Sequence, residues 1–334
     1  MKNMPFAWIL AAALVTGGVA GCKKSGSRPS TYSPPAWTPG ADIYFVGEDS
    51  AQAVYWKNGV KIKLGAGAAS GIAIDGSSVY VGGTVVNGGG SGSINLPAYW
   101  KDGVAQTLAD ADNGGSAGQP VIAGGDVYLP GNIGTGSTTS AVYWKNGQRV
   151  DLDPGAPGAA WGMAVSGSDV YVIGVLYGTV NGDTNLVWKN GQRLSSTYVI
   201  GAKPYSQIFV SGGYLYLLGY YGYQINFGVL NPLSGSTGLA NSMYLDGSTK
   251  YLAGTWSSAA GVRAVYWKDE EMDTLSIYPG TTYSTANTIV VAGTDVYIAG
   301  RDEANANLAV YWKNGVEETL TKQGYVNGGA VAGN

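Results

Sequence analysis

A short aromatic motif recurs along most of this chain, and its spacing constrains the fold more than any other feature. Tyr-Trp-Lys followed by Asn or Asp occurs five times, and Val-Trp-Lys-Asn occurs once. The first four tryptophans are 44 residues apart, and the next step of 44 falls at Pro232. We interpret residues 226–232 as a further, eroded copy. The motif tryptophans are Trp56, Trp100, Trp144, Trp188, Trp267 and Trp312.

A second motif alternates with the first and resembles Val-Tyr-Val-x-Gly. Its tyrosines are Tyr44, Tyr80, Tyr128, Tyr171, Tyr216, Tyr251 and Tyr297. Together the two motifs predict four short strands per unit, because Asn-Gly pairs such as Asn146-Gly147 suit two-residue type I′ hairpin turns. Four strands in about 42 residues is the spacing of a β-propeller blade.

We therefore predict an all-β fold: a seven-bladed β-propeller of four-stranded antiparallel blades over residues 41–334. The body begins with a second strand at 42–47 and ends with a first strand at 329–333. We expect this C-terminal strand to pair with the N-terminal strand around Tyr44 and close the ring, which would remove exposed sheet edges. The repeated tryptophans are expected to pack between blades rather than to form a ligand ring.

Residues 1–21 predict a lipoprotein signal peptide. A charged start precedes an apolar run at 7–15 that is too short to span a bilayer. Val19-Ala20-Gly21-Cys22 resembles the bacterial lipobox, which implies that Cys22 is acylated and holds the protein at a membrane. Ser- and Pro-rich residues 22–40 predict a tether. In bacterial lipoproteins, an Asp directly after the lipidated cysteine is a signal for retention at the inner membrane, and this chain has Lys23 at that position. We therefore expect a lipid-anchored protein of the bacterial cell envelope, at the outer membrane, either periplasmic or surface-exposed.

Composition removes several classes of function. The chain has no histidine and one cysteine, so the usual neutral-pH acid–base group and the usual zinc ligand are absent. We predict no catalytic residue, no metal site and no cofactor. Charged residues make up 12% of the chain, the net charge is −3, and no basic cluster stands out. Nucleic acid is therefore not an expected partner.

Residues 141–152, with the sequence AVYWKNGQRVDL, resemble the HAF family of extracellular repeats. Those repeats carry a similar aromatic-Trp-x-Asn-Gly segment followed by Asp-Leu. The resemblance extends over roughly residues 41–334 and departs where HAF repeats begin with His-Ala-Phe, since this chain has no histidine. The resemblance implies the fold and an extracellular setting, and it supplies no catalytic residues.

The connections opposite the Asn-Gly turns, such as 82–96 and 176–184, vary in length and are rich in aromatic residues. Variable loops on one face of a rigid scaffold are typical of a binding surface. We expect a non-catalytic binding or scaffold lipoprotein that presents this Tyr/Trp-rich loop face to a protein or polysaccharide ligand. The candidate ligand-binding residues are Trp161, Tyr205, Tyr220, Tyr221, Tyr223, Trp256, Arg263, Arg301 and Asp302.

Two alternatives remain open. A glycoside hydrolase or lyase would need two carboxylates about 5–10 Å apart. A purely structural assembly component would instead use the outer edges of its blades, with the eroded fifth unit at 206–240 as the docking edge. The acidic residues available to an enzyme in the variable loops are Asp110, Asp112, Asp153, Asp183, Asp302 and Glu303.

Overall fold

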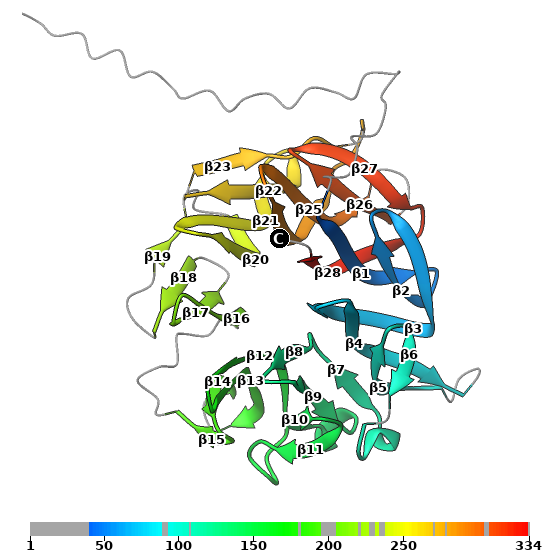
Figure 1. Ribbon diagram of the computed structural model, residues 1–334, viewed down its shortest axis with the longest axis vertical. Coiled ribbons are helices and arrows are strands. Elements are labelled where there is room, and N and C mark those ends of the chain that lie inside the picture. The colour runs from blue at the N-terminus through cyan, green and yellow to red at the C-terminus, as the bar shows by residue number, and fades with distance from the viewer. Residues whose placement is uncertain are drawn as a thin grey trace, which may run out of the picture.

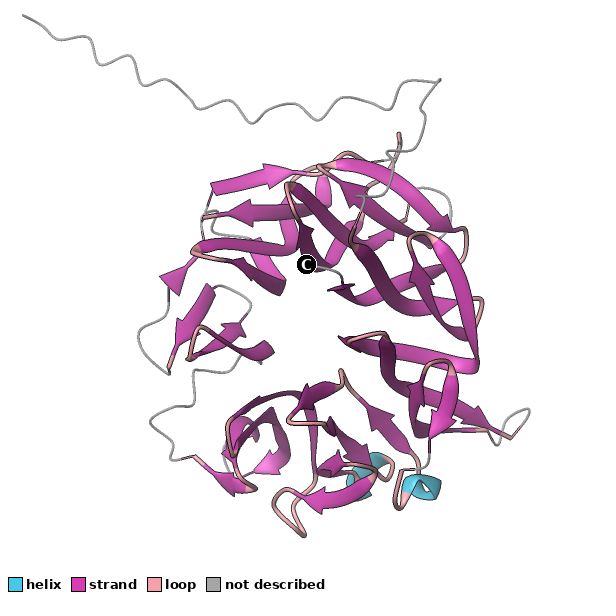
Figure 2. Ribbon diagram, viewed as in Figure 1, coloured by secondary structure: helices cyan, strands magenta, loops and turns pink. Residues whose placement is uncertain are grey.

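The computed structural model describes residues 40–88, 93–106, 108–179, 182–194, 205–219, 222–226, 231–233, 238–269, 271–277, 279–303 and 307–332. Antiparallel sheets follow one another in chain order around a ring (Figure 1). In these ranges the helical segments are two single 3-10 turns, η2 (Ala111–Asn113) and η3 (Gly136–Thr138) (Figure 2). The prediction of an all-β fold is confirmed.

The described strands form six sheets. The first, in the spatial order β28-β1-β2-β3-β4-β5-β6, contains β1 (Asp42–Asp49), β2 (Gln52–Lys57), β3 (Val60–Asp75), β4 (Ser78–Asn87), β5 (Ile94–Lys101), β6 (Val104–Gln106) and β28 (Gly324–Ala332). The second contains β7 (Gly115–Ala117), β8 (Val121–Ala123), β9 (Asp126–Ile133), β10 (Ser140–Lys145) and β11 (Gln148–Asp151).

The other four sheets each have four strands in sequential order. The third and fourth contain β12 (Gly158–Ser166), β13 (Asp169–Thr179), β14 (Gly182–Lys189), β15 (Gln192–Arg193), β16 (Tyr205–Ser211), β17 (Tyr214–Gly219), β18 (Gly222–Ile225) and β19 (Asn231–Pro232). The fifth and sixth contain β20 (Gly238–Asp246), β21 (Thr249–Ser258), β22 (Gly261–Lys268), β23 (Glu271–Thr274), β24 (Ser284–Ala292), β25 (Asp295–Asp302), β26 (Leu308–Lys313) and β27 (Val316–Thr321).

The first sheet holds two groups of four strands because β3 belongs to both. Its first half pairs with β2 and its second half with β4. Gly65 and Gly67 have φ values of 126° and 139°, which L side chains rarely adopt, so the chain turns between the groups without a loop. The connections 82–96 and 176–184 are likewise shorter than predicted, because β4, β5, β13 and β14 extend into them.

We call the strand that begins each group its first strand: β28, β3, β7 with β8, β12, β16, β20 and β24. Most first strands contain a β-bulge, in which one extra residue faces the partner strand. In the group that begins with β7, Pro120 follows Gly118 and Gln119, and the first strand is split into β7 and β8. Proline has no N–H to give to the ladder, which explains the break. We call the extra residues the bulge residues: Ser70, Trp161, Ser206, Asn241, Asn287 and Asn327.

The bulge explains the glycine of the second motif. A Cβ atom at Gly300 would overlap the carbonyl oxygen of Thr285, and it would lie 2.9 Å from that carbonyl carbon. The equivalent glycines that oppose a carbonyl in the same way are Gly47, Gly83, Gly131, Gly174 and Gly254.

The first motif forms a repeated polar group at the ends of the strands. Lys145 Nζ lies 2.8 Å from Asp126 Oδ2 and 5.2 Å from the centre of the Tyr128 ring. Asn146 donates to Asp126 at 2.7 Å and has φ of 50°, as the type I′ turn requires. The same arrangement occurs at Asp42, Tyr44, Lys57 and Asn58, at Asp169, Tyr171, Lys189 and Asn190, and at Asp295, Tyr297, Lys313 and Asn314.

The six motif tryptophans are buried, each with at most 1% of its surface exposed. They pack between neighbouring sheets: Trp312 shares a cluster with Ile298 of its own sheet and with Tyr251 of the preceding one. The prediction that these residues pack between sheets is confirmed. Burial of a large aromatic side chain stabilises the fold by about 1.5–3 kcal/mol.

The eroded copy lies earlier than the 44-residue spacing predicted. Tyr216 pairs with Ile225, as Tyr171 pairs with Lys189 in the preceding sheet. Asn226 has φ of 48° and occupies the turn position. Gln224, rather than Pro232, therefore stands at the tryptophan position. Gly219 pairs with Gly222, so the chain turns back early and fewer residues lie between Tyr216 and the turn at Asn226. This explains the shift.

The two ends of the described chain meet in one sheet. β28 pairs antiparallel with β1, with Ala330 opposite Tyr44 and Gly324 opposite Asp49. The Asp49 carboxylate also accepts a hydrogen bond from Thr321 Oγ1 at 2.9 Å. The pairing that the sequence predicts around Tyr44 is present.

Candidate functional site

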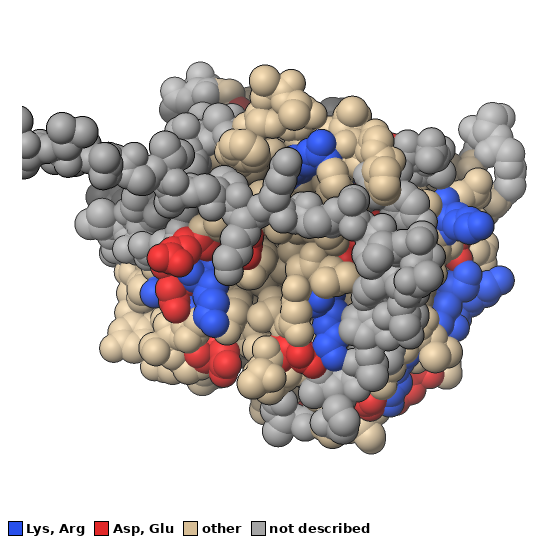
Figure 3. All heavy atoms as spheres, turned by 90° about the horizontal axis from the view of Figure 1, so that it is seen from above, with Lys and Arg blue, Asp and Glu red and all other residues tan. Residues whose placement is uncertain are grey.

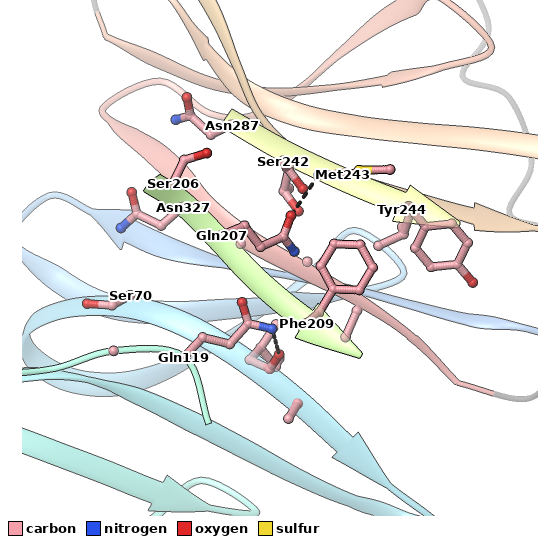
Figure 4. A pocket seen from close by; sticks show the side chains of 18 of the residues that line it. Ser70, Gln119, Ser206, Gln207, Phe209, Ser242, Met243, Tyr244, Asn287 and Asn327 are labelled. Carbon is pink, nitrogen blue, oxygen red and sulfur yellow. Dashed lines mark hydrogen bonds between the residues drawn. The ribbon is translucent and has the colours of Figure 1, made fainter. Parts of the chain in front are cut away.

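A cavity of about 690 Å³ opens between the first strands of the groups (Figure 4). Its walls come from β3, β7, β12, β16, β20, β24 and β28. The volume is in the range of small-molecule binding sites. All the described residues that line it are uncharged.

Five bulge residues link neighbouring first strands through their side chains. Each side chain donates a hydrogen bond to a backbone carbonyl in the first strand of the following group. The acceptor belongs to the residue just before the bulge residue of that strand. Asn287 Nδ2, for example, donates to Val326 O at 2.7 Å. The others are Trp161 Nε1 to Tyr205 O at 2.8 Å, Asn241 Nδ2 to Ala286 O at 2.9 Å, Asn327 Nδ2 to Ala69 O at 2.8 Å and Ser206 Oγ to Ala240 O at 3.3 Å. The Ser206 hydroxyl lies at the same distance from Leu218 O in its own sheet and shares its one proton between the two carbonyls.

The cavity has a polar end and a more apolar end. Ser206, Asn287 and Asn327 lie toward one end in Figure 4, and Phe209 and Tyr244 lie toward the other. Burial raises the pKa of the Tyr244 phenol above its usual value, and the nearby Asp246 carboxylate raises it further. This hydroxyl therefore stays neutral at physiological pH.

Trp161 is the predicted ligand-binding residue that lines this cavity. It sits at the bulge of β12, not in a loop, and its ring is half-buried. Its indole N–H is held by Tyr205 O, which fixes the orientation of the ring.

Three other predicted ligand-binding residues are buried instead of forming an exposed loop face. Tyr205 and Tyr223 have 5% and 2% of their surface exposed and belong to hydrophobic clusters. Asp302 is fully buried and accepts a hydrogen bond from Thr281 Oγ1 at 2.6 Å. All three lie within strands, since β16, β18 and β25 extend beyond the predicted loop boundaries. The Tyr205 and Tyr223 side chains therefore pack in the core, and the Asp302 carboxylate takes part in a buried hydrogen bond.

Trp256, Arg263 and Arg301 are half-buried near the polar end of the first strands. Trp256 lies opposite Gly238, the first residue of β20, and also opposite Arg263 on β22. Arg301 forms an ion pair with Glu303 at 2.7 Å and covers the Tyr283 ring. Tyr220, Tyr221 and the predicted lipidation site Cys22 lie outside the described residues.

The carboxylates that an enzyme would need are placed outside the cavity lining. Asp153 binds Trp188 Nε1 and Arg193, each at 2.5 Å. Asp110 pairs with Arg149 at 3.3 Å, and Asp183 accepts a hydrogen bond from the Gly178 N–H at 3.0 Å. These contacts give the carboxylates roles within loops and strand ends.

Several cavity residues that the sequence analysis did not single out are polar and uncharged. Alanine precedes the polar bulge residue at Ala69-Ser70, Ala240-Asn241 and Ala286-Asn287, and this short pattern is the signal that could have identified them. The others are Gln119, Ser206, Gln207 and Asn327.

Acidic and basic side chains lie beside one another in small groups on the face seen in Figure 3, without one large patch of a single sign. In the part of the chain that the structure describes, no three His, Cys, Asp or Glu side chains gather as metal ligands. No described helix has the length and hydrophobicity needed to cross a membrane.

No protein-family model matches the sequence, and no curated protein matches it. Among solved structures, the chain is similar to a puromycin-hydrolyzing peptidase from Mycobacterium tuberculosis, with a TM-score of 0.52 and 11% identity over 84% of this chain and 53% of that one. It is also similar to the Pyrococcus horikoshii acylaminoacyl peptidase, with a TM-score of 0.51 and 13% identity over 86% of this chain and 52% of that one. The β-propeller domain of the Trilobed protease from Pyrococcus furiosus aligns with a TM-score of 0.48 and 11% identity, over 86% and 97% of the two chains.

The chain spans about half the length of the two peptidases, and 32% of the length of the extracellular domain of BT4673 from B. thetaiotaomicron. At these identities the similarity concerns the fold alone. The protein is an all-β chain whose structural neighbours include a β-propeller.

Proposed function

We propose that this protein is a lipid-anchored, non-catalytic binding module of the bacterial cell envelope, built as a closed seven-bladed β-propeller. The six sheets contain seven groups of four strands, since β3 serves two groups. The pairing of β28 with β1 supports closure, because the chain runs from β27 of the last group into β28, which completes the first group beside β1.

The uncharged central cavity is the observation that carries the binding role. Its polar end lies where the variable connections reach the first strands, and it combines amide, hydroxyl and aromatic side chains. The six loop carboxylates lie outside its lining, which favours binding over hydrolysis. The ligand is a protein or a polysaccharide of the envelope.

The envelope location rests on the N-terminal sequence. Cys22 follows a lipobox-like run, and residues 22–40 would hold the propeller away from the membrane. The resemblance to HAF repeats supports an extracellular or periplasmic setting. Replacing Cys22 with Ser should abolish labelling by radioactive palmitate and release the chain from the membrane fraction; labelling that persists would contradict the anchor.

Binding is tested with the full chain and two matched variants. Ser70→Tyr places a bulky side chain at an exposed cavity position, and Ser77→Tyr makes the same change in the exposed turn between β3 and β4. We expect fractionated envelope glycans or proteins to bind the native chain and Ser77→Tyr but not Ser70→Tyr, with no release of new reducing ends. Equal binding by the two variants would contradict the cavity as the site. Sugar turnover that disappears when the loop acids are replaced would establish an enzyme instead.

A further inference from the structure

The hydrogen bonds of three bulge residues fix which way their amides point. Asn241, Asn287 and Asn327 each place a side-chain nitrogen 2.7–2.9 Å from a backbone carbonyl oxygen. A carbonyl oxygen only accepts hydrogen bonds, so the NH₂ group must face it and Oδ1 must point elsewhere. Three amide oxygens in successive first strands are therefore left as acceptors at the cavity wall.

Gln207 supplies the complementary donor. Its Oε1 accepts a hydrogen bond from the Met243 N–H at 2.8 Å, which turns its NH₂ group away from that strand. Ser70 and Gln119 add a hydroxyl and a second amide at exposed positions of the cavity lining (Figure 4). The polar end thus offers both donors and acceptors with no net charge.

Aromatic surface completes the cavity. Trp161 is held in place at the polar end, and Phe209 stacks on Tyr216 with ring centres 5.2 Å apart. Phe209 and Tyr244 line the other end. Rigid aromatic faces beside paired amide donors and acceptors suit a ligand with apolar faces and polar edges.

We infer that the cavity takes the end of a neutral oligosaccharide, with the asparagine amides bonding its hydroxyls and the aromatic rings contacting its faces. This inference rests on the proposed binding function and names its ligand class. Each sugar hydroxyl both donates and accepts, which matches the mixed wall formed by Asn241, Asn287 and Gln207.

Charge and backbone pairing disfavour other ligands. An anionic ligand would lose hydration without meeting a cation among the described lining residues, which is costly. A peptide that added as a strand would need free carbonyls, but Ala286 O and Val326 O already accept bonds from the asparagines.

The test uses the full chain in a zwitterionic detergent, which has no sugar headgroup to compete. Maltohexaose, cellohexaose, mannohexaose and chitohexaose are titrated by calorimetry, with hexagalacturonate and hexalysine as charged comparators. We expect a neutral hexasaccharide to bind, and Ser70→Tyr to weaken binding by about tenfold or more. Gln207→Glu keeps the oxygen that accepts from Met243 and removes the donor, so it should weaken binding as well. Ser77→Tyr should bind as the native chain does, and thermal melts verify that each variant is folded.

The outcomes separate this inference from the proposed function. A neutral oligosaccharide that binds equally to Ser70→Tyr and Ser77→Tyr overturns the assignment of the site. Binding of hexagalacturonate or hexalysine alone, or of an envelope protein alone, overturns the ligand class and leaves the binding function standing. If neither the oligosaccharides nor any envelope fraction binds, both proposals fail.

Discussion

Replacing Gly300 with Ala should destabilise this protein, although alanine is the better strand residue in isolation. Gly→Ala normally stabilises a protein by about 0.4–1 kcal/mol, because it restricts the unfolded chain. At Gly300 the added Cβ would overlap Thr285 O and would lie 2.9 Å and 3.1 Å from Thr285 C and Ala286 Cα. All three are backbone atoms beside the Asn287 bulge, so the strands must separate.

Overpacking of this kind costs about 1–3 kcal/mol, and each ladder hydrogen bond lost adds about 1 kcal/mol. We expect a net loss of about 2–3 kcal/mol, which corresponds to a fall of about 3–5 °C in Tm for a chain of this size. Gly328→Ala is the comparison variant, because its Cβ would approach the Val46 side chain at 3.3 Å and no backbone atom nearer than 3.5 Å, so it should cost clearly less than Gly300→Ala. Thermal melts followed by circular dichroism measure both. If the two variants melt together, the bulge does not explain the repeated glycine.

Four further changes test other parts of the structure. Asn287→Leu removes the donor to the fully buried Val326 O and should cost about 1–3 kcal/mol in guanidinium unfolding, whereas Asn113→Leu on the exposed η2 turn should be close to neutral. Trp312→Ala should cost about 3–5 kcal/mol, and Trp161→Ala less, because its ring is half-buried; equal losses would contradict the packing role of the motif tryptophans. Hydrogen bonds from Lys145 and Lys189 lower the pKa values of Asp126 and Asp169, so their stabilisation is complete above pH 3.8 and is lost as the pH falls through the lowered values. The double variant Asp126→Asn, Asp169→Asn should therefore show a flatter fall of Tm below pH 3.8 than the native chain. Deleting residues 326–334 removes most of the partner of β1 and should lower Tm sharply, so an unchanged melt would refute closure through this strand.

The repeat made much of the fold predictable, because each motif residue has one local role. The strand tyrosines, the Asn-Gly turns and the buried tryptophans follow from alternation and turn chemistry alone. The site was less predictable, since a β-bulge depends on which residue faces which across the sheet. Tyr205 and Tyr223 were expected in loops, but the strands extend further and bury them. The role of Asn241 and Asn287 could not be predicted from the sequence, because it depends on carbonyl groups 39–45 positions away in the chain.

The bulge residues also limit how the site can vary. At Asn241, Asn287 and Asn327 one side chain both links two first strands and lines the cavity, so a change that alters ligand contacts also breaks a link between strands. Ser70 and Gln119 are different, because they are exposed, and the Gln119 amide reaches Ile72 O only at 3.5 Å. Variation at these two positions can change the cavity wall at little cost in stability. In the proposed binding site, specificity can therefore be altered between β3 and β7, while the asparagines keep neighbouring first strands linked.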